Sequence, residues 1–335
     1  MRAIVQDAYG SADAMRFDAD VERPVPGDDD VLVRVHAAGV DAGVWHLMTG
    51  TPYLVRLMGY GLRRPKYRIP GMDMAGTVEA VGANVTRLRP GDEVFGMGKG
   101  AFAEYACAPQ AKLALKPPSL SFEQAAALPV SGLTALQALR DSGGIRAGQK
   151  VLVIGASGGV GSYAVQLAKA YGAEVTGVCG TAKSDLVRSL GADHVIDYTR
   201  TEIGAGAGTA TGTAGGAPDR YDLVLDIAGG RPLSRLRRAL TPRGTLVLVG
   251  NEAGGRWSGG MGRLLRAVLL SPFVGQRLRP MAAVERYEDL DVLADFVGTG
   301  RLTPALDRTY PLSEAPEAVR SLAEHRVRGK SAVTV

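Results

Sequence analysis

Residues 151–167 read VLVIGASGGVGSYAVQL, and this stretch decides the fold of the second half of the chain. An apolar run typical of a buried strand leads into a glycine-rich turn, and a run with helical spacing follows. Small residues at such a turn let the backbone approach a pyrophosphate, whose charge then lies at the helix N-terminus. The pattern is GxxGxxG, with Ala156 where the usual fingerprint has its second glycine. It predicts a dinucleotide site; a tight turn without a ligand is the alternative.

The residues after this turn repeat the alternation of strand and helix. Strand-like runs begin at residues 174, 194, 221 and 244, and helix-like runs lie among them. This order predicts an α/β domain with a doubly wound parallel sheet. Residues 203–220, IGAGAGTATGTAGGAPDR, are low in complexity and carry little apolar bulk. We expect them to form a mobile surface loop.

The first 120 or so residues have a different character. Short alternating runs such as VLVRVHAAGV, from Val31, are separated by Gly and Pro and predict a β-rich domain. From Phe122 the sequence changes to helix formers with helical spacing, and Pro129 interrupts the helix.

The amino-acid composition excludes several classes of protein. The chain has 335 residues, of which 46% are apolar and 22% charged, so it is globular rather than disordered. Its net charge of +5 suits an anionic small molecule, and we expect no nucleic-acid partner. Two cysteines, Cys107 and Cys179, form no CxxC pair. The sequence shows no signal peptide and no long apolar run, so we expect a cytoplasmic protein without membrane insertion.

The end of the second strand of the α/β domain bears on the choice of cofactor. An NAD site usually has an acidic residue there to hold the ribose hydroxyls. The strand EVTGVC is instead followed by Gly180, Thr181, Ala182 and Lys183. Hydroxyl and ammonium groups suit a 2′-phosphate, so NADPH is favoured over NADH. The alternative is that Lys183 only solvates the start of a helix.

Several motifs, taken together and in this order, resemble the zinc-independent medium-chain dehydrogenase/reductase family, in particular its quinone oxidoreductase (zeta-crystallin-like) branch. They cover nearly the whole chain: AAGV, PGMDMAGTVEAVGANV, GDEVFG, FAEYA, SGLTAL, GASGGVG, LGADHVIDY and YPLSEAPEAV. The resemblance implies a GroES-like β-barrel domain of residues 1–122, completed by 281–335, and a Rossmann NADP(H)-binding domain of residues 123–280. It also implies an active site in the cleft and a homodimer.

The same resemblance implies a set of cofactor-binding residues. The expected contacts run from the nicotinamide to the pyrophosphate and the adenosine phosphate. They are Thr134, Ser157, Gly158, Gly159, Val160, Gly180, Thr181, Lys183, Tyr198, Gly250 and Asn251.

Zinc-containing members of the superfamily use Cys, a His-Glu pair and a further Cys or His as ligands. Here those positions read Asp41, Met72-Asp73 and residues 128–130, LPV. Two aspartates are a poor set for a metal that needs three protein ligands, so we expect no metal. Without a Lewis acid, oxidation of simple alcohols is disfavoured.

The remaining chemistry is hydride transfer from NADPH to an activated acceptor, a quinone or an α,β-unsaturated carbonyl. By the resemblance, Tyr53 is the candidate acid or substrate contact, and Trp45 and Asp41 lie in the same region. We expect residues 54–69 to form a loop that shapes substrate choice or acts as a lid. Two alternatives stay open: an NAD(P)-dependent alcohol or aldehyde dehydrogenase, and a nucleotide-binding protein without turnover.

Overall fold

The structure is a computed structural model that describes residues 1–201, 220–250, 255, 257 and 259–335. The chain forms two compact units. Unit 1 comprises Met1–Leu133 and Val284–Val335, and unit 2 comprises Thr134–Ala283. Most of the predicted glycine-rich loop, residues 203–220, and the predicted contact Asn251 lie outside the described residues.

Unit 1 is built on a largely antiparallel sheet. A separate two-stranded ribbon, β1 (Ala3–Gln6) and β2 (Met15–Asp18), lies at the start of the chain. Alternate residues of the long strand β3 (Asp30–Val40) point into a core of aliphatic side chains, as the VLVRVHAAGV pattern predicts. The strand order in the sheet is β14 (Leu306–Pro311), β15 (Lys330–Thr334), β3 (Asp30–Val40), β4 (Asp73–Val81), β5 (Glu93–Met97) and β7 (Leu113–Leu115), with β6 (Tyr105–Pro109) also paired to β3.

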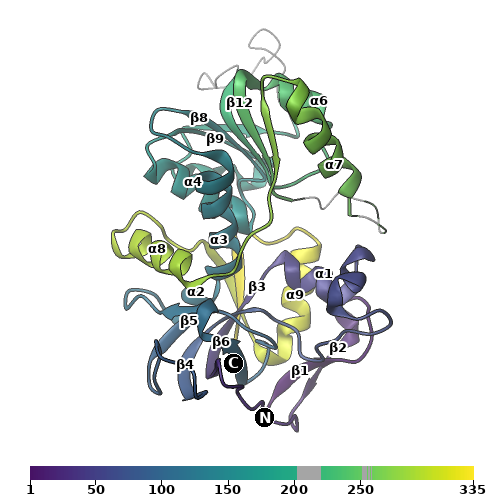
Figure 1. Cartoon of the computed structure of the whole chain (residues 1–335), viewed down its shortest axis with the longest axis vertical. Helices are drawn as coiled ribbons and strands as arrows, with labels where there is room; N and C mark the ends of the chain where they lie inside the picture. Colours follow the sequence, from purple (N-terminus) through teal and green to yellow (C-terminus); the bar gives the residue numbers. More distant parts are fainter. Residues whose placement is uncertain (202–219, 251–254, 256, 258) are drawn as a thin grey trace. The chain divides into compact units, whose positions relative to one another are not determined.

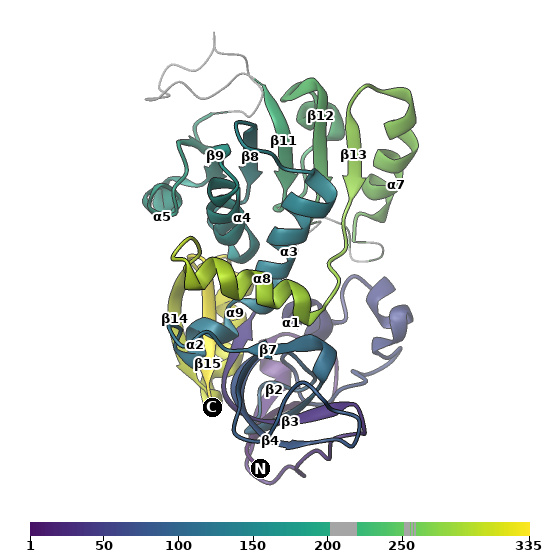
Figure 2. The same cartoon turned by 60° about the vertical axis from the view of Figure 1, so that its left-hand side comes forward.

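The C-terminal segment completes this sheet. Strand β15 pairs antiparallel with β3, and β14 pairs with β15, so residues far apart in sequence share one sheet (Figure 2). The helices of unit 1 are α1 (Ala42–Thr49), α2 (Phe122–Ala126), α8 (Tyr287–Gly298) and α9 (Ala315–Ala323), while α3 (Pro129–Gln137) runs across the boundary between the units. The end of α2 before Pro129 agrees with the predicted interruption of the helix.

Unit 2 contains a six-stranded parallel sheet. Figure 2 shows β9, β8, β11, β12 and β13 side by side. The strand order reverses between β8 and β11, which is where such sheets bind their ligands. The strands, in sheet order, are β10 (His194–Asp197), β9 (Glu174–Cys179), β8 (Lys150–Ile154), β11 (Tyr221–Asp226), β12 (Leu240–Leu248) and β13 (Arg277–Pro280).

Helices cover both faces of this sheet. Figure 1 shows α4 and α7 on opposite faces. The helices are α4 (Gly159–Ala170), α5 (Ser184–Ser189), α6 (Leu233–Arg238) and α7 (Met261–Leu270). The predicted fold, a β-rich domain and a doubly wound parallel-sheet domain, is confirmed. Among the described residues, no helix combines the length and apolarity that crossing a membrane requires.

Candidate cofactor and acceptor sites

The glycine-rich turn of unit 2 joins β8 to α4, as predicted. Gly155 follows the strand with φ of +90°, a conformation that favours glycine. Gly161 lies in the first turn of α4, where an added Cβ would stand 2.0 Å from the carbonyl oxygen of Gly155. These two glycines are required because the turn packs tightly against the start of the helix.

Gly158, in the same turn, differs from these two glycines because the space beside it is open. A Cβ added here would meet nothing closer than the Gly155 carbonyl oxygen at 3.5 Å, so the space above it is open. As the N-cap of α4, Gly158 offers no side chain to cap the helix, whose N-terminus carries the positive end of the helix dipole. Ser157, Gly159 and Val160 flank this opening. The turn therefore fits the pyrophosphate of a dinucleotide.

The predicted adenosine-phosphate residues come together at the end of β9. The backbone N–H of Tyr198 donates to the carbonyl of Cys179 at 3.1 Å. A Cβ on Gly180 would lie 3.5 Å from the Tyr198 hydroxyl, so the tyrosine lies against this glycine. The N–H of Lys183 donates to the Gly180 carbonyl at 3.0 Å, which folds a short turn around Thr181.

Sequence analysis missed an acidic residue at this position. The Thr181 hydroxyl donates to the carboxylate of Asp197, the last residue of β10. Hydrogen bonds from Thr181 and Thr199 lower the pKa of this carboxyl below its usual range. The signal was present in DHVIDY, but the prediction considered only the end of β9. Parallel pairing places Asp197 beside Cys179, which ends β9, and so supplies the acid from the neighbouring strand.

The predicted nicotinamide end of the site is described only in part, because Asn251 lies outside the described residues. Gly250 follows β12, and an added Cβ would stand 1.8 Å from the carbonyl oxygen of Ile227, so the backbone here is closely packed. Thr134 lies half-buried in α3. An ion pair joins the buried Asp226, at the end of β11, to the half-buried Arg263 of α7. Sequence analysis missed this pair because its members come from separate elements.

In unit 1, Asp41 begins helix α1. Its Oδ1 accepts hydrogen bonds from the N–H groups of Gly43 at 2.6 Å and Val44 at 3.2 Å, which makes it an N-cap. Its Oδ2 is buried and has no hydrogen-bond partner among the described residues. Trp45, one turn later, is half-buried and packs against the core.

Tyr53 follows α1 and lies against an arginine. The guanidinium of Arg56 is 4.7 Å from the centroid of the Tyr53 ring and 4.3 Å from that of Tyr9. Arg56 Nε also donates to the carbonyl of Gly50 at 2.9 Å. These contacts hold Tyr53 and Arg56 as a pair. The catalytic roles of Tyr53, Asp41 and Trp45 stay predictions.

Asp73 forms a second carboxylate centre in unit 1. It is fully buried, and its Oδ1 accepts from the Val130 N–H at 3.1 Å. Its Oδ2 lies 3.6 Å from the ammonium of Lys330, which is also buried. Burial, together with the negative charge of Asp41, raises the pKa of Asp73 well above its ordinary value, and Lys330 opposes this shift.

These residues do not fit a zinc ion. No group of three or more His, Cys, Asp or Glu side chains within the described part of the chain is arranged to hold a metal. A catalytic zinc needs three protein ligands, and here an ammonium group stands next to the Asp73 carboxylate. Burial also raises the pKa of the Cys107 thiol to about 11, which disfavours its metal-binding thiolate form.

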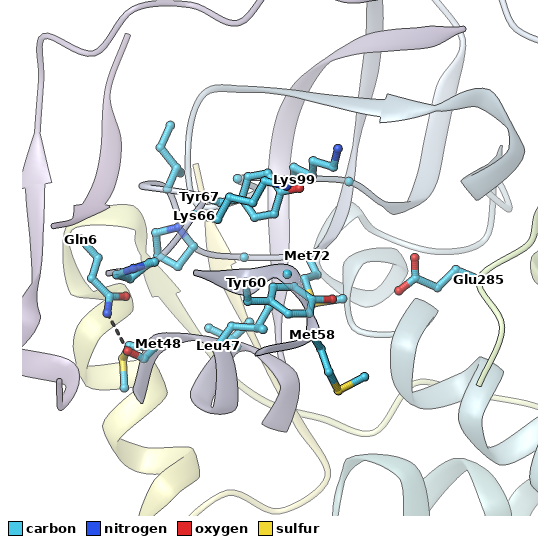
Figure 3. Close-up of a pocket in the computed structure, with 18 of the residues that line it drawn as sticks. Gln6, Leu47, Met48, Met58, Tyr60, Lys66, Tyr67, Met72, Lys99 and Glu285 are labelled. Carbon is cyan, nitrogen blue, oxygen red and sulfur yellow. Dashed lines mark hydrogen bonds between the residues drawn. The ribbon is translucent and has the colours of Figure 1, made fainter. Parts of the chain in front are cut away.

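Unit 1 contains a cavity of about 350 Å³, here called the unit-1 pocket (Figure 3). Its volume falls at the lower end of small-molecule sites, which run from about 300 to 1,000 Å³. Tyr53, Asp41 and Trp45 do not line it, although their neighbours on α1 do. Its apolar and aromatic lining includes Val44, Leu47, Met48, Met58, Tyr60, Tyr67, Ile69 and Met72, and its charged lining is Lys66, Lys99, Lys112 and Glu285.

Comparison with known proteins agrees with this geometry. A family described as "Alcohol dehydrogenase GroES-like domain" matches residues 27–118, and one described as "Zinc-binding dehydrogenase" matches residues 190–333. A chloroplast envelope quinone oxidoreductase homologue from Arabidopsis thaliana is 32% identical over 98% of this chain and 97% of its own length.

Two solved structures have the same fold over the full chain. The quinone oxidoreductase of Coxiella burnetii has a TM-score of 0.84 and 27% identity, covering 100% of this chain and 99% of its own. A mycobacterial protein in complex with NADPH has a TM-score of 0.81 and 26% identity, covering 100% of both chains.

The fold and its nucleotide turn define an oxidoreductase that uses a nicotinamide dinucleotide. The chain belongs to the medium-chain dehydrogenase/reductase family, in its quinone oxidoreductase branch.

Proposed function

We propose that the chain is a zinc-independent oxidoreductase that uses NADPH to reduce a quinone or an α,β-unsaturated carbonyl compound. The buried Asp73–Lys330 pair carries this proposal, because it stands where related zinc enzymes need a metal ligand. Without a Lewis acid, the alkoxide of a simple alcohol lacks a strong electrostatic stabiliser. The acceptor must therefore bring a carbonyl that is already activated by conjugation.

The chain's own residues bind the reactants and handle the proton. When bound, NADPH supplies the hydride, and one proton must also reach the acceptor to convert a quinone to its hydroquinone. We assign to the Tyr53 hydroxyl the hydrogen bond or proton donated to the acceptor oxygen. The nearby Arg56 guanidinium favours the negative charge that develops on that oxygen. Asp41 and Trp45 are assigned as further contacts of the acceptor.

The cofactor preference follows from the end of β9. The open turn at Gly158 suits the pyrophosphate, and Thr181 and Lys183 suit a 2′-phosphate. The mycobacterial complex with NADPH supports this assignment. The Asp197 carboxylate opposes it, because a fixed negative charge beside Thr181 repels a phosphate. We therefore expect a modest preference for NADPH over NADH.

Two other functions compete with this one. An alcohol or aldehyde dehydrogenase is the first, since the family descriptions name an alcohol dehydrogenase and a zinc-binding dehydrogenase; it would need either a metal or another stabiliser of the alkoxide. A nucleotide-binding protein without turnover is the second competitor. The homodimer and the cytoplasmic location stay predictions.

The test is oxidation of NADPH and NADH, followed by absorbance, with a panel of quinones and enones in the presence and absence of a chelator. We expect oxidation that the chelator does not affect and that is faster with NADPH. Activity that is lost to the chelator, or that appears only with alcohols and NAD⁺, would establish the dehydrogenase instead. Tight cofactor binding without turnover of any acceptor would establish the non-catalytic function.

A further inference from the structure

The wall of the unit-1 pocket comes from a segment with an unusual charge pattern. Between Asp41 and Asp73 the sequence contains no acidic residue. The same interval contains five cations, namely Arg56, Arg63, Arg64, Lys66 and Arg68. Of these five, Lys66 lines the pocket and Arg68 is paired with Asp7, so this segment brings to the described lining one positive charge and no negative one.

The first strand and the turn after it hold this segment in place. The Tyr9 hydroxyl donates to the carbonyl of Tyr60 at 2.9 Å and to that of Gly61 at 2.6 Å. The backbone N–H of Gln6 donates to the Arg68 carbonyl at 2.8 Å. Because two separate points of the segment are fixed to the β1 region, the pocket wall is formed before a ligand arrives, which lowers the entropy cost of binding.

The charges that line the pocket do not cancel. Glu285 is its single acidic lining residue among those described, and it pairs with Lys112. Lys66 and Lys99 form no ion pair with any residue that the structure describes. Their ammonium groups lie 5.7 Å and 5.3 Å from the centroid of the Tyr67 ring, so both charges lie near the same aromatic side chain (Figure 3).

The pocket thus combines an apolar interior with two uncompensated positive charges on exposed side chains at its rim. It also borders the start of α1. A Cβ on Gly43 would stand 2.8 Å from Asp41 Oδ1 and 3.6 Å from the sulfur of Met72, which lines the pocket. The predicted acceptor contact Asp41 and the pocket wall are therefore near neighbours.

We propose that the unit-1 pocket, which adjoins the predicted contact Asp41, binds the side chain of the acceptor, and that this acceptor is an apolar quinone or enone whose side chain carries an anionic group that Lys66 and Lys99 bind. The inference rests on the proposed reductase function and names its substrate class. Lysines act as point charges rather than planar forks, so a carboxylate or a sulfonate satisfies them equally. Because both side chains are exposed, we expect a preference of about tenfold over a neutral analogue, and salt weakens it.

The experiment uses two acceptors that differ in one charge. A 1,4-naphthoquinone with a propionate side chain is compared with its methyl ester, whose methylene spacer keeps the ring electronics the same. The enzyme with saturating NADPH should show a KM for the acid about tenfold below that for the ester. In a Lys66→Gln/Lys99→Gln variant, the ratio of the two KM values should approach one.

A matched control separates the pocket from the general charge of the segment. Arg63 and Arg64 belong to the same segment and are exposed, but neither lines the pocket. The Arg63→Gln/Arg64→Gln variant removes the same charge and should keep the wild-type KM ratio. Thermal unfolding and NADPH affinity, read in each variant, check that the fold is intact.

The outcomes are distinct. Equal KM values for acid and ester in the wild type, or the same loss of ratio in both double variants, would overturn the anionic substrate class and leave the reductase function intact. Failure of the wild type to reduce either compound, or any other quinone or enone, would overturn the reductase function together with this inference.

Discussion

The ammonium of Lys330 lies 3.6 Å from Oδ2 of Asp73, and both side chains are buried in unit 1. The two residues begin strands β15 and β4, which flank β3 on either side. Neither of these two atoms has a hydrogen-bond partner among the described residues. Each charge is therefore compensated chiefly by the other, and this dependence makes the pair sensitive to substitution.

Removal of one member of this pair should be costly. In Lys330→Met, Asp73 stays buried beside Asp41 without its cation, and the free energy of unfolding should fall by about 3 kcal/mol. Urea unfolding measures the change. The double variant Asp73→Asn/Lys330→Met should recover most of it, while the exposed Lys150→Met should change little. A loss below about 1 kcal/mol for Lys330→Met would mean that Asp73 takes up a proton or that water reaches it.

The raised pKa of Asp73 predicts the direction in which the stability of the protein changes with pH. A carboxyl whose pKa is raised in the folded state contributes stability below its ordinary pKa of 3.8 and loses it as pH rises through the folded value. The wild type should therefore lose stability relative to Asp73→Asn as pH rises above about 4. The slope is at most about 1.4 kcal/mol per pH unit. Urea unfolding of both proteins at several pH values tests this, and a pH-independent difference would contradict it.

Two glycines of the nucleotide turn should respond differently to alanine. Gly158→Ala adds a methyl group to open space, so the fold should persist while the Kd for NADPH rises about tenfold, because the methyl occupies the pyrophosphate position. Gly161→Ala places its methyl group against the Gly155 carbonyl, so it should destabilise the protein by about 2 kcal/mol or more. Calorimetric titration and thermal unfolding measure the two effects. Equal NADPH affinity in wild type and Gly158→Ala would show that the cofactor does not bind at this turn.

Opposite charges near Thr181 predict opposite shifts in cofactor preference. Lys183→Gln should lower the ratio of kcat/KM for NADPH to that for NADH by about tenfold, because it removes a charge-assisted contact with the 2′-phosphate. Asp197→Asn should raise the same ratio, because it removes a carboxylate bonded to Thr181. Steady-state kinetics with both cofactors measures the two ratios. If both substitutions shift the ratio in the same direction, the 2′-phosphate does not bind here.

The prediction of the site was best where the determinants are local. The β8 turn and α4 could be read from residues 151–167, because glycine spacing, strand burial and helical periodicity act within a few residues. The same holds for the interruption of the helix at Pro129, since proline fixes its own backbone. The grouping of Gly180, Thr181, Lys183 and Tyr198 was also expected, and their binding roles stay predictions.

Side-chain pairs between distant elements could not be predicted in this way. Asp197 reaches Thr181 through the pairing of β10 with β9, and Asp226 meets Arg263 through the packing of α7 on the sheet. The unit-1 pocket likewise depends on the ion pair between Glu285 and Lys112, which lie far apart in the sequence. Its residues 58–69 fall in the segment that was expected to shape substrate choice.

The sequence alone determined the class of fold, the position of the nucleotide turn and the family, because each is recorded in contiguous residues with characteristic spacing. Only the tertiary structure decided which charges neutralise one another. Asp73 acquires Lys330 as a partner and Lys66 acquires no acid among the described residues, because strand pairing between remote segments sets the distances on which electrostatic interactions depend.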